Sequence, residues 1–299
     1  MKNILYLSCL AILIVACTEQ KTAPTNISIT DKPVKTQDVN YTKKQIKELK
    51  TASKVVYNLP SPAEMAKILF ETEAIYDANV LNNPKAIQGY YTDVSRALNL
   101  GVYFADLSFT SMYDYPQQAM LYMSAAQGLS EELNIVGVFN ENLMTRLEDN
   151  MNNKDSIMEI VANTYMETDI YLQENNRSVL AKAILAGAWL EGLYVATELN
   201  TPADRQDAVW KKIGEQKKGL SNMISMLDDC NEPQLTDLLT DLRKLETTFT
   251  AIKIEQQKLS NDSAKSIAPV INTVVISPEA KKAIKAETKA CRNKIVSGK

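Results

Sequence analysis

Apolar side chains recur every three or four residues along most of the chain from about Ser61 onward. Two representative stripes run through Met65, Ile68, Leu69, Thr72, Tyr76 and Val80, and through Val179, Leu180, Ala183, Ile184, Gly187 and Leu190. Residues at this spacing lie on one face of an α-helix. Long alternating stretches typical of strands are lacking, although INTVVI near Ile271 could form one short strand. The pattern therefore predicts an all-α body.

Capping residues indicate where several helices begin. Ser61-Pro62-Ala63-Glu64 combines an N-cap serine, a proline in the first turn and a capping-box glutamate. Thr201-Pro202-Ala203-Asp204 and Ser277-Pro278-Glu279 are similar, and Asn82-Asn83-Pro84 is expected to end one helix and begin the next. We expect helices near residues 62–82, 84–112, 116–136, 140–153, 155–175, 177–200, 202–229, 232–258 and 278–297.

A Gly-apolar-Tyr-apolar-Ala sequence occurs twice, as GVYFA at 101–105 and as GLYVA at 192–196. The same offset of 91 residues relates Gly-Leu-Ser at 128–130 to 219–221 and Asn-Glu at 140–141 to 231–232. Several matches in one register predict an internal duplication of a four-helix unit. The expected parts are copy one at about 61–153, copy two at about 154–258 and a C-terminal helix at about 278–297.

The alternative to duplication is two unrelated tight helix crossings. In either case the small residues of each motif let a neighbouring helix approach closely. Tyr103 or Tyr194 is then expected to fill the space beside the small residues.

The amino terminus begins with Lys2 and an apolar run from Ile4 to Ala16, which is too short for an ordinary membrane span. A run of this length behind a basic start is typical of a signal peptide. Its end, Ile14-Val15-Ala16-Cys17, resembles the bacterial lipobox, and the resemblance implies cleavage after Ala16 and lipidation of Cys17. Residues 1–16 would then be the signal peptide, and residues 17–60 the lipidated cysteine with a polar tether. The alternative is an ordinary signal with an incidental cysteine and later cleavage.

The residues after the cysteine bear on localisation. Thr18 stands where an aspartate would be the usual mark for retention in the inner membrane, which favours the outer membrane, with the body facing the periplasm or the cell surface. The expected partner is the membrane, through the N-terminal lipid, together with an envelope protein or peptide. Lipobox, tether and helical body resemble uncharacterised lipoproteins of the Bacteroidota, a resemblance that implies no activity.

Composition excludes several kinds of function. The chain has no histidine, which removes His-based triads and the usual zinc and haem ligands, and no Gly-rich phosphate loop is found. With 33 basic and 36 acidic residues and a pI near 5.3, nucleic acid is not an expected partner. No catalytic motif, metal site or cofactor is predicted, and the sequence leaves enzymatic activity open.

Polar and aromatic side chains within apolar helical stretches are the remaining candidates for a binding site: Tyr103, Asp106, Trp189, Glu191 and Tyr194. A buried carboxylate needs a partner or a raised pKa, and such groups are enriched at functional sites. The alternatives are a carboxylate bonded to a tyrosine of the other copy, or a solvated face. We favour a non-enzymatic binding or scaffolding module over a small-molecule or cation-binding protein, with or without enzymatic activity, that uses this cluster.

Cys230 and Cys291 are the thiols that remain in the body after lipidation of Cys17. A disulfide between them would tie the last helix to the second copy, and such bonds persist outside the cytoplasm. Each could equally be an ordinary small buried residue. We slightly favour unpaired thiols.

Overall fold

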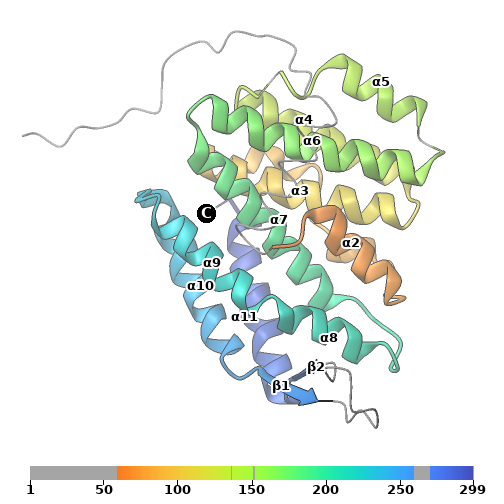
Figure 1. Cartoon of the computed structure of the whole chain (residues 1–299). Coiled ribbons are helices and arrows are strands. Elements are labelled where there is room, and N and C mark those ends of the chain that lie inside the picture. Colours follow the sequence, from red (N-terminus) through yellow and green to blue (C-terminus); the bar gives the residue numbers. More distant parts are fainter. Residues whose placement is uncertain (1–58, 136, 151, 259–269, 299) are drawn as a thin grey trace, which may run out of the picture. The chain divides into compact units, whose positions relative to one another are not determined.

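Two long apolar helices, α3 (Asp93–Met112) and α7 (Ser178–Glu198), pack against each other at the centre of the helical body (Figure 1). The computed structural model describes residues 59–135, 137–150, 152–258 and 270–298, all of which fall in one compact unit. The described part is nearly all helical, which confirms the all-α prediction. The lipobox, Cys17 and the tether lie outside the described residues.

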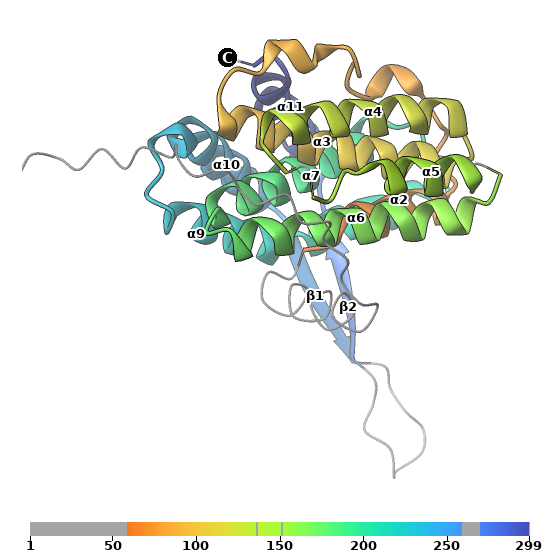
Figure 2. The ribbon, with the colours of Figure 1, turned by 90° about the horizontal axis from the view of Figure 1, so that it is seen from above.

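The other helices surround this central pair (Figure 2). On one side lie α2 (Pro62–Glu71), α4 (Pro116–Glu132), α5 (Glu141–Asp149) and α6 (Lys154–Glu174). On the other side lie α8 (Gln206–Glu215), α9 (Lys217–Asp228), α10 (Thr236–Phe249) and α11 (Pro278–Val296). Short 3₁₀ turns are η1 (Ala78–Val80), η2 (Ala86–Gly89) and η3 (Pro233–Leu235).

The close approach of α3 and α7 depends on two glycines. A Cβ atom on Gly101 would lie 2.0 Å from the Ile184 carbonyl oxygen, and one on Gly187 would lie 1.9 Å from the Leu98 carbonyl oxygen. The two backbones are therefore in direct contact. The close approach predicted for GVYFA is confirmed, but its glycine partner on α7 is Gly187 rather than Gly192 of the second motif, whose Cβ would meet the Met65 side chain.

Two of the helix starts predicted from capping residues are confirmed, and the starts expected near 116, 140, 155 and 177 agree within one residue. Ser61 and Glu64 form a reciprocal capping box, in which the Glu64 N–H donates to Ser61 Oγ and the Ser61 N–H donates to Glu64 Oε2. The Ser277 hydroxyl oxygen accepts the Ala280 N–H at the start of α11. These caps act locally, through residues three positions apart, and this is why the sequence revealed them.

Other boundaries were wrong. The helix expected at 62–82 ends at Glu71, where Glu73 takes a left-handed conformation (φ 56°), and the next begins at Asp93 with Thr92 as its N-cap instead of at Pro84. The helix expected at 202–229 starts at Gln206 and divides into α8 and α9 at Gln216. Here local signals were outweighed by contacts with distant residues.

The helix expected at 232–258 ends at Phe249. Strand β1 (Lys253–Lys258) follows it and pairs antiparallel with β2 (Val270–Val275), with Lys253 opposite Val275 and Lys258 opposite Val270. The possible strand around Ile271 is thus present, and its partner comes from a segment that was expected to be helical.

The helix bounds of the two predicted copies agree only in part. At the 91-residue offset α3 overlaps α7, but residues 116–132 of α4 correspond to 207–223, which are shared between α8 and α9. The equivalents of α6 include the end of α10 and strand β1. The two-copy division therefore stays a prediction.

By length and composition, α7 could also cross a membrane. In this fold, however, 83% of its most apolar window is buried by the surrounding helices. We therefore describe it as the central helix of the body.

We expect Gly101→Ala to destabilise the protein by at least about 2 kcal/mol, because the new methyl group would collide with the backbone of α7. Urea unfolding followed by circular dichroism measures the change. Gly89→Ala is the matched control, since nothing lies within 4 Å of a Cβ at that position. Equal stability of the two variants would contradict the observed helix crossing.

Candidate functional site

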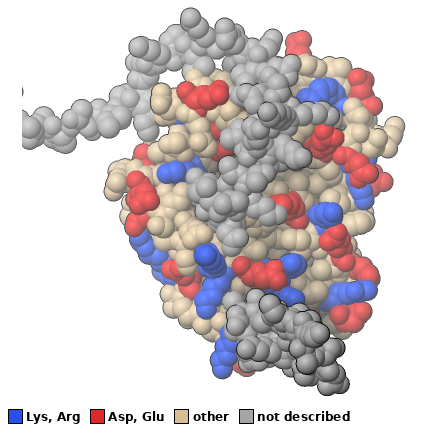
Figure 3. Space-filling view, viewed as in Figure 1, with Lys and Arg blue, Asp and Glu red and all other residues tan. Residues whose placement is uncertain are grey.

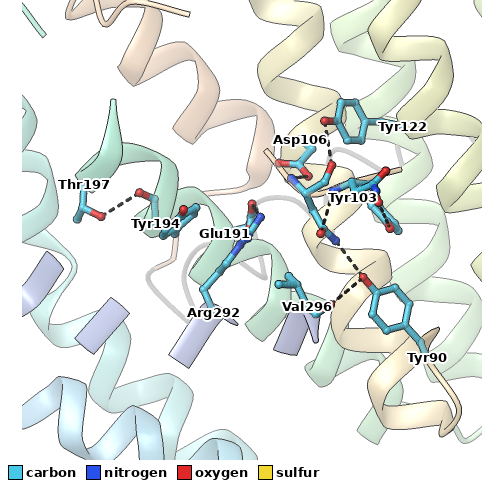
Figure 4. A network of polar contacts seen from close by, with 11 residues as sticks. Tyr90, Tyr103, Asp106, Tyr122, Glu191, Tyr194, Thr197, Arg292 and Val296 are labelled. Atoms are coloured by element: carbon cyan, nitrogen blue, oxygen red, sulfur yellow. Dashed lines mark hydrogen bonds and ion pairs between the residues drawn. The ribbon is translucent and has the colours of Figure 1, made fainter. Parts of the chain in front are cut away.

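Two acidic residues face the interior from the central helices, Asp106 on α3 and Glu191 on α7 (Figure 4). Both are fully buried, with 0% of each residue exposed. The two helices meet at Gly101 of α3 and Gly187 of α7. Asp106 follows Gly101 by five residues and Glu191 follows Gly187 by four, which is a little more than one helical turn in each case. The tight crossing thus brings the two carboxyl groups into the same buried region.

Glu191 is neutralised by Arg292 of α11. Arg292 Nε and one of its terminal nitrogens each donate to a different Glu191 oxygen at 2.8 Å, which makes a bidentate pair. The guanidinium carbon also lies 4.5 Å from the centre of the Tyr194 ring. Burial lowers the pKa of Arg292, but the hydrogen bonds and charge of Glu191 outweigh it and raise the pKa overall. Removal of either partner of such a pair generally costs about 3–5 kcal/mol, because the other charge stays buried.

Asp106 has a different environment. One of its oxygens accepts the Asn82 N–H at 3.0 Å, whereas Oδ1 has no hydrogen-bond donor among the described residues. Burial raises the pKa of Asp106 well above its usual range, and the Glu191 carboxylate raises it further, while Arg292 and the Asn82 N–H act in the opposite direction. Burial and the Glu191 carboxylate therefore favour the protonated, uncharged form of Asp106.

Tyrosines around Asp106 hold the loop between η1 and η2. The Tyr122 hydroxyl donates to the Asn82 carbonyl oxygen at 3.0 Å, and the Tyr103 hydroxyl donates to the Asn83 carbonyl oxygen at 2.9 Å. The Asn82 side-chain amide donates to the Tyr90 hydroxyl at 3.1 Å. The Asn-Asn-Pro loop is therefore stabilised by side chains from α3 and α4, and the Tyr90 hydroxyl reaches the Val296 carbonyl oxygen of α11 at 3.4 Å.

Four of the five predicted residues meet in this network: Tyr103, Asp106, Glu191 and Tyr194. Trp189 lies elsewhere, and its indole N–H donates to Gln216 Oε1 at 3.4 Å, where α8 meets α9. The residues expected to line a binding site are instead 7% exposed or less, and their polar groups or rings contact other residues of the fold, namely Asn82, Asn83, Gln216 and Arg292.

Sequence reasoning missed Arg292. It lies on α11 among several exposed lysines, but it also falls within the buried stripe of that helix, which contains Ala280, Ile284, Thr288, Cys291 and Ile295. A basic residue on the buried side of an amphipathic helix signals a buried partner. This signal was present in the sequence, but it did not identify which acid Arg292 binds.

A second set of charges fixes α11 against α7. Glu198 lies two turns after Glu191 on α7, and Lys285 lies two turns before Arg292 on α11. The ammonium group of Lys285 pairs with the Glu198 carboxylate at 3.2 Å. This spacing is expected of antiparallel helices in contact. On its other side α11 is joined to α10 through Lys294, whose ammonium group lies 2.7 Å from each Asp241 oxygen.

A groove of about 610 Å³ lies beside this anchored helix, near the point marked C in Figure 1. Its lining comes from residues at and around the start of α3, the start of α10 and the end of α11. These residues are Tyr91, Thr92, Val94, Ser95, Leu98, Gln234, Asp237, Leu238, Asp241, Cys291, Lys294, Ile295 and Gly298. Its base consists of buried, mostly apolar residues, whereas Tyr91 is 77% exposed at its rim. The volume is within the range of small-molecule sites.

Neither cysteine of the described body forms a disulfide, as we slightly favoured. Cys291 is buried at the groove, and burial, together with the nearby Asp241 charge, raises the pKa of its thiol to about 12. A thiol with this pKa is a poor nucleophile at neutral pH. Cys230 is half-buried, and its thiol lies 3.4 Å from the Met226 carbonyl oxygen.

Among the described residues, neither the surface charge nor the arrangement of potential metal ligands indicates a further binding site. Positive and negative side chains are interspersed on the face drawn in Figure 3, in keeping with the nearly balanced composition. In the part of the chain that the structure describes, no group of three or more potential metal ligands comes together.

Comparison with known proteins found no matching family model, and no curated protein or solved structure matches the chain significantly. Function must therefore be inferred from the residues and their geometry.

The protonated state of Asp106 predicts a pH dependence. A pKa that is raised in the native state contributes stability that is complete below the unfolded pKa of about 4 and is lost as pH rises through the native pKa. Asp106→Asn keeps the acceptor for the Asn82 N–H and has an uncharged side chain that does not titrate. We expect this variant to gain stability relative to the wild type between pH 4 and 7, by up to about 1.4 kcal/mol per pH unit.

Urea unfolding at several pH values tests this expectation. The variant Glu148→Gln, which removes an exposed carboxyl group of α5, gives the background for loss of one surface charge. A stability difference between Asp106→Asn and wild type that stays constant from pH 4 to 7 would show that Asp106 is ionised in the native state.

Proposed function

We propose that this protein is a lipid-anchored lipoprotein of the bacterial outer membrane whose helical body is a binding module. The anchor rests on the lipobox-like Ile-Val-Ala-Cys sequence that ends at Cys17. Several acyl chains together hold a protein stably on a membrane, whereas one chain binds only marginally. A flexible tether of about forty residues has a root-mean-square reach of roughly 35 Å, enough to keep a body clear of lipid headgroups.

The groove between α3, α10 and α11 is the observation that carries the binding role. It combines a buried apolar base with polar and aromatic groups at its rim, the usual composition of a ligand site. Its walls come from three helices that the Lys294–Asp241 ion pair and the Tyr90–Val296 contact hold together, so it is formed before any ligand arrives. Preformed sites lose less conformational entropy on binding.

The second hypothesis, a small-molecule or cation site at the Tyr103, Asp106, Glu191 and Tyr194 cluster, has less support. The Glu191 charge is compensated by Arg292, and the tyrosines bind the loop at Asn82 and Asn83 or pack on Arg292. These groups act as internal supports of the fold, and they leave no charge for a ligand to compensate.

Cys17→Ser should abolish fatty-acid labelling of the protein and leave uncleaved precursor, because only a thiol can form the lipid thioether. Metabolic labelling with an alkyne fatty acid and a mobility comparison on gels measure both effects. Cys9→Ser is a matched control within the same segment and should change neither. A Cys17→Ser protein that is still acylated and membrane-bound would refute the lipoprotein assignment.

Occupation of the groove can be tested in intact cells with a photo-crosslinking amino acid. We expect an adduct when p-benzoylphenylalanine replaces Tyr91, at the rim, and none when it replaces Leu121, an exposed residue of α4 outside the groove lining. Mass spectrometry of the adduct distinguishes a small ligand from a protein. Failure to form an adduct at Tyr91, or an equal one at Leu121, would contradict binding at this groove.

A further inference from the structure

We propose that the groove between α3, α10 and α11 binds a small amphiphilic amine, with its apolar body on the base of the groove and its positive charge near Asp237 and Tyr91. This inference rests on the binding role proposed above and adds the chemical class of the ligand.

The base of the groove is apolar and closed. Val94 and Leu98 from α3, Leu238 from α10 and Ile295 from α11 line it and are each 8% exposed or less, so apolar side chains of three helices contribute to the base. Transfer of apolar ligand surface from water to such a base is favourable in proportion to its area. An entirely polar ligand would gain nothing there.

The charged side chains that line the groove carry a net negative charge. Its lining contains two acids and one base, Asp237, Asp241 and Lys294. Lys294 already contacts both oxygens of Asp241 at 2.7 Å, so its charge is compensated. Asp237 is exposed; its charge contributes to the raised pKa of Lys294, but no ion pair joins it to a lysine or arginine of the described residues. A ligand that supplies one positive charge would balance the groove.

Tyr91 adds a second feature that favours a cation. Its side chain extends into solvent at the rim, and no ring contact with another described aromatic residue supports it. The face of an aromatic ring attracts an ammonium group within about 6 Å of its centroid. An anionic ligand would meet Asp237 and the negative ring face without a compensating free base.

Three matched probes test the charge class: 2-(4-fluorophenyl)ethylamine, 2-(4-fluorophenyl)ethanol and 3-(4-fluorophenyl)propionate. They share the aromatic body and differ in the polar group. Binding to the full lipidated protein in phosphatidylcholine nanodiscs is measured by ¹⁹F relaxation, with empty nanodiscs as the reference for partitioning into lipid. We expect the amine to bind at least about fivefold more tightly than the propionate, as one favourable and one unfavourable charge contact imply.

Variants assign the binding to the groove. Asp237→Asn and Tyr91→Ala should each weaken amine binding about threefold, whereas Asp237→Glu should keep it and Glu148→Gln on α5 should leave it unchanged. Leu98→Trp, which fills the base, should abolish it, and thermal unfolding checks that each variant is folded.

Equal binding of amine and propionate, insensitivity to Asp237→Asn, or no probe binding at all would overturn this inference. Those results are separate from failure of the binding role itself. An adduct at Tyr91 in cells together with indifference to amines would keep the binding module and discard the ligand class, whereas absence of the adduct would discard the binding role.

Discussion

The backbone contact between α3 and α7 is the constraint on which the rest of the structure depends. Gly101 and Gly187 have no side chains, and each packs against a carbonyl oxygen of the other helix. A Cβ atom at either position would lie about 2 Å from that oxygen, which is too close for a methyl group. Helices usually pack with their axes 8–10 Å apart, and glycines at the contact permit the lower end of that range. The crossing fixes which residues of the two helices face one another one turn further on.

Those residues are acidic, and their burial determines the position of the C-terminal helix. Two carboxyl groups in one buried region cannot both stay ionised without compensation. The Glu191 charge is compensated by Arg292 of α11, and the raised pKa of Asp106 favours its uncharged form. The central helix α7 is apolar enough to span a membrane, yet its one fully buried acid requires a basic partner from a helix about a hundred residues later.

The same helix that compensates Glu191 also forms one wall of the groove. Arg292 points toward α7, while Cys291, Lys294 and Ile295 line the groove, so one turn of α11 serves both the interior and the surface. Gly298, just after α11, has φ 70°. A Cβ atom at this position would lie 2.2 Å from the Gly89 carbonyl oxygen, so Gly298 packs directly against the backbone of η2. The groove wall and the Glu191–Arg292 ion pair thus depend on the position of the same turn of α11.

The sequence by itself determined the helical class, the capped starts at Ser61 and Ser277 and the need for close packing at GVYFA, because these depend on residues a few positions apart. It also singled out Asp106 and Glu191 as acids within apolar helical stretches, with burial and a solvated face both left open. Only the tertiary structure decided that Gly187 rather than Gly192 meets α3, that Arg292 compensates Glu191, and that residues 253–258 form a strand instead of a helical turn. Each of these depends on a partner distant in the sequence, and periodicity reports which face of an element is buried but not what it is buried against.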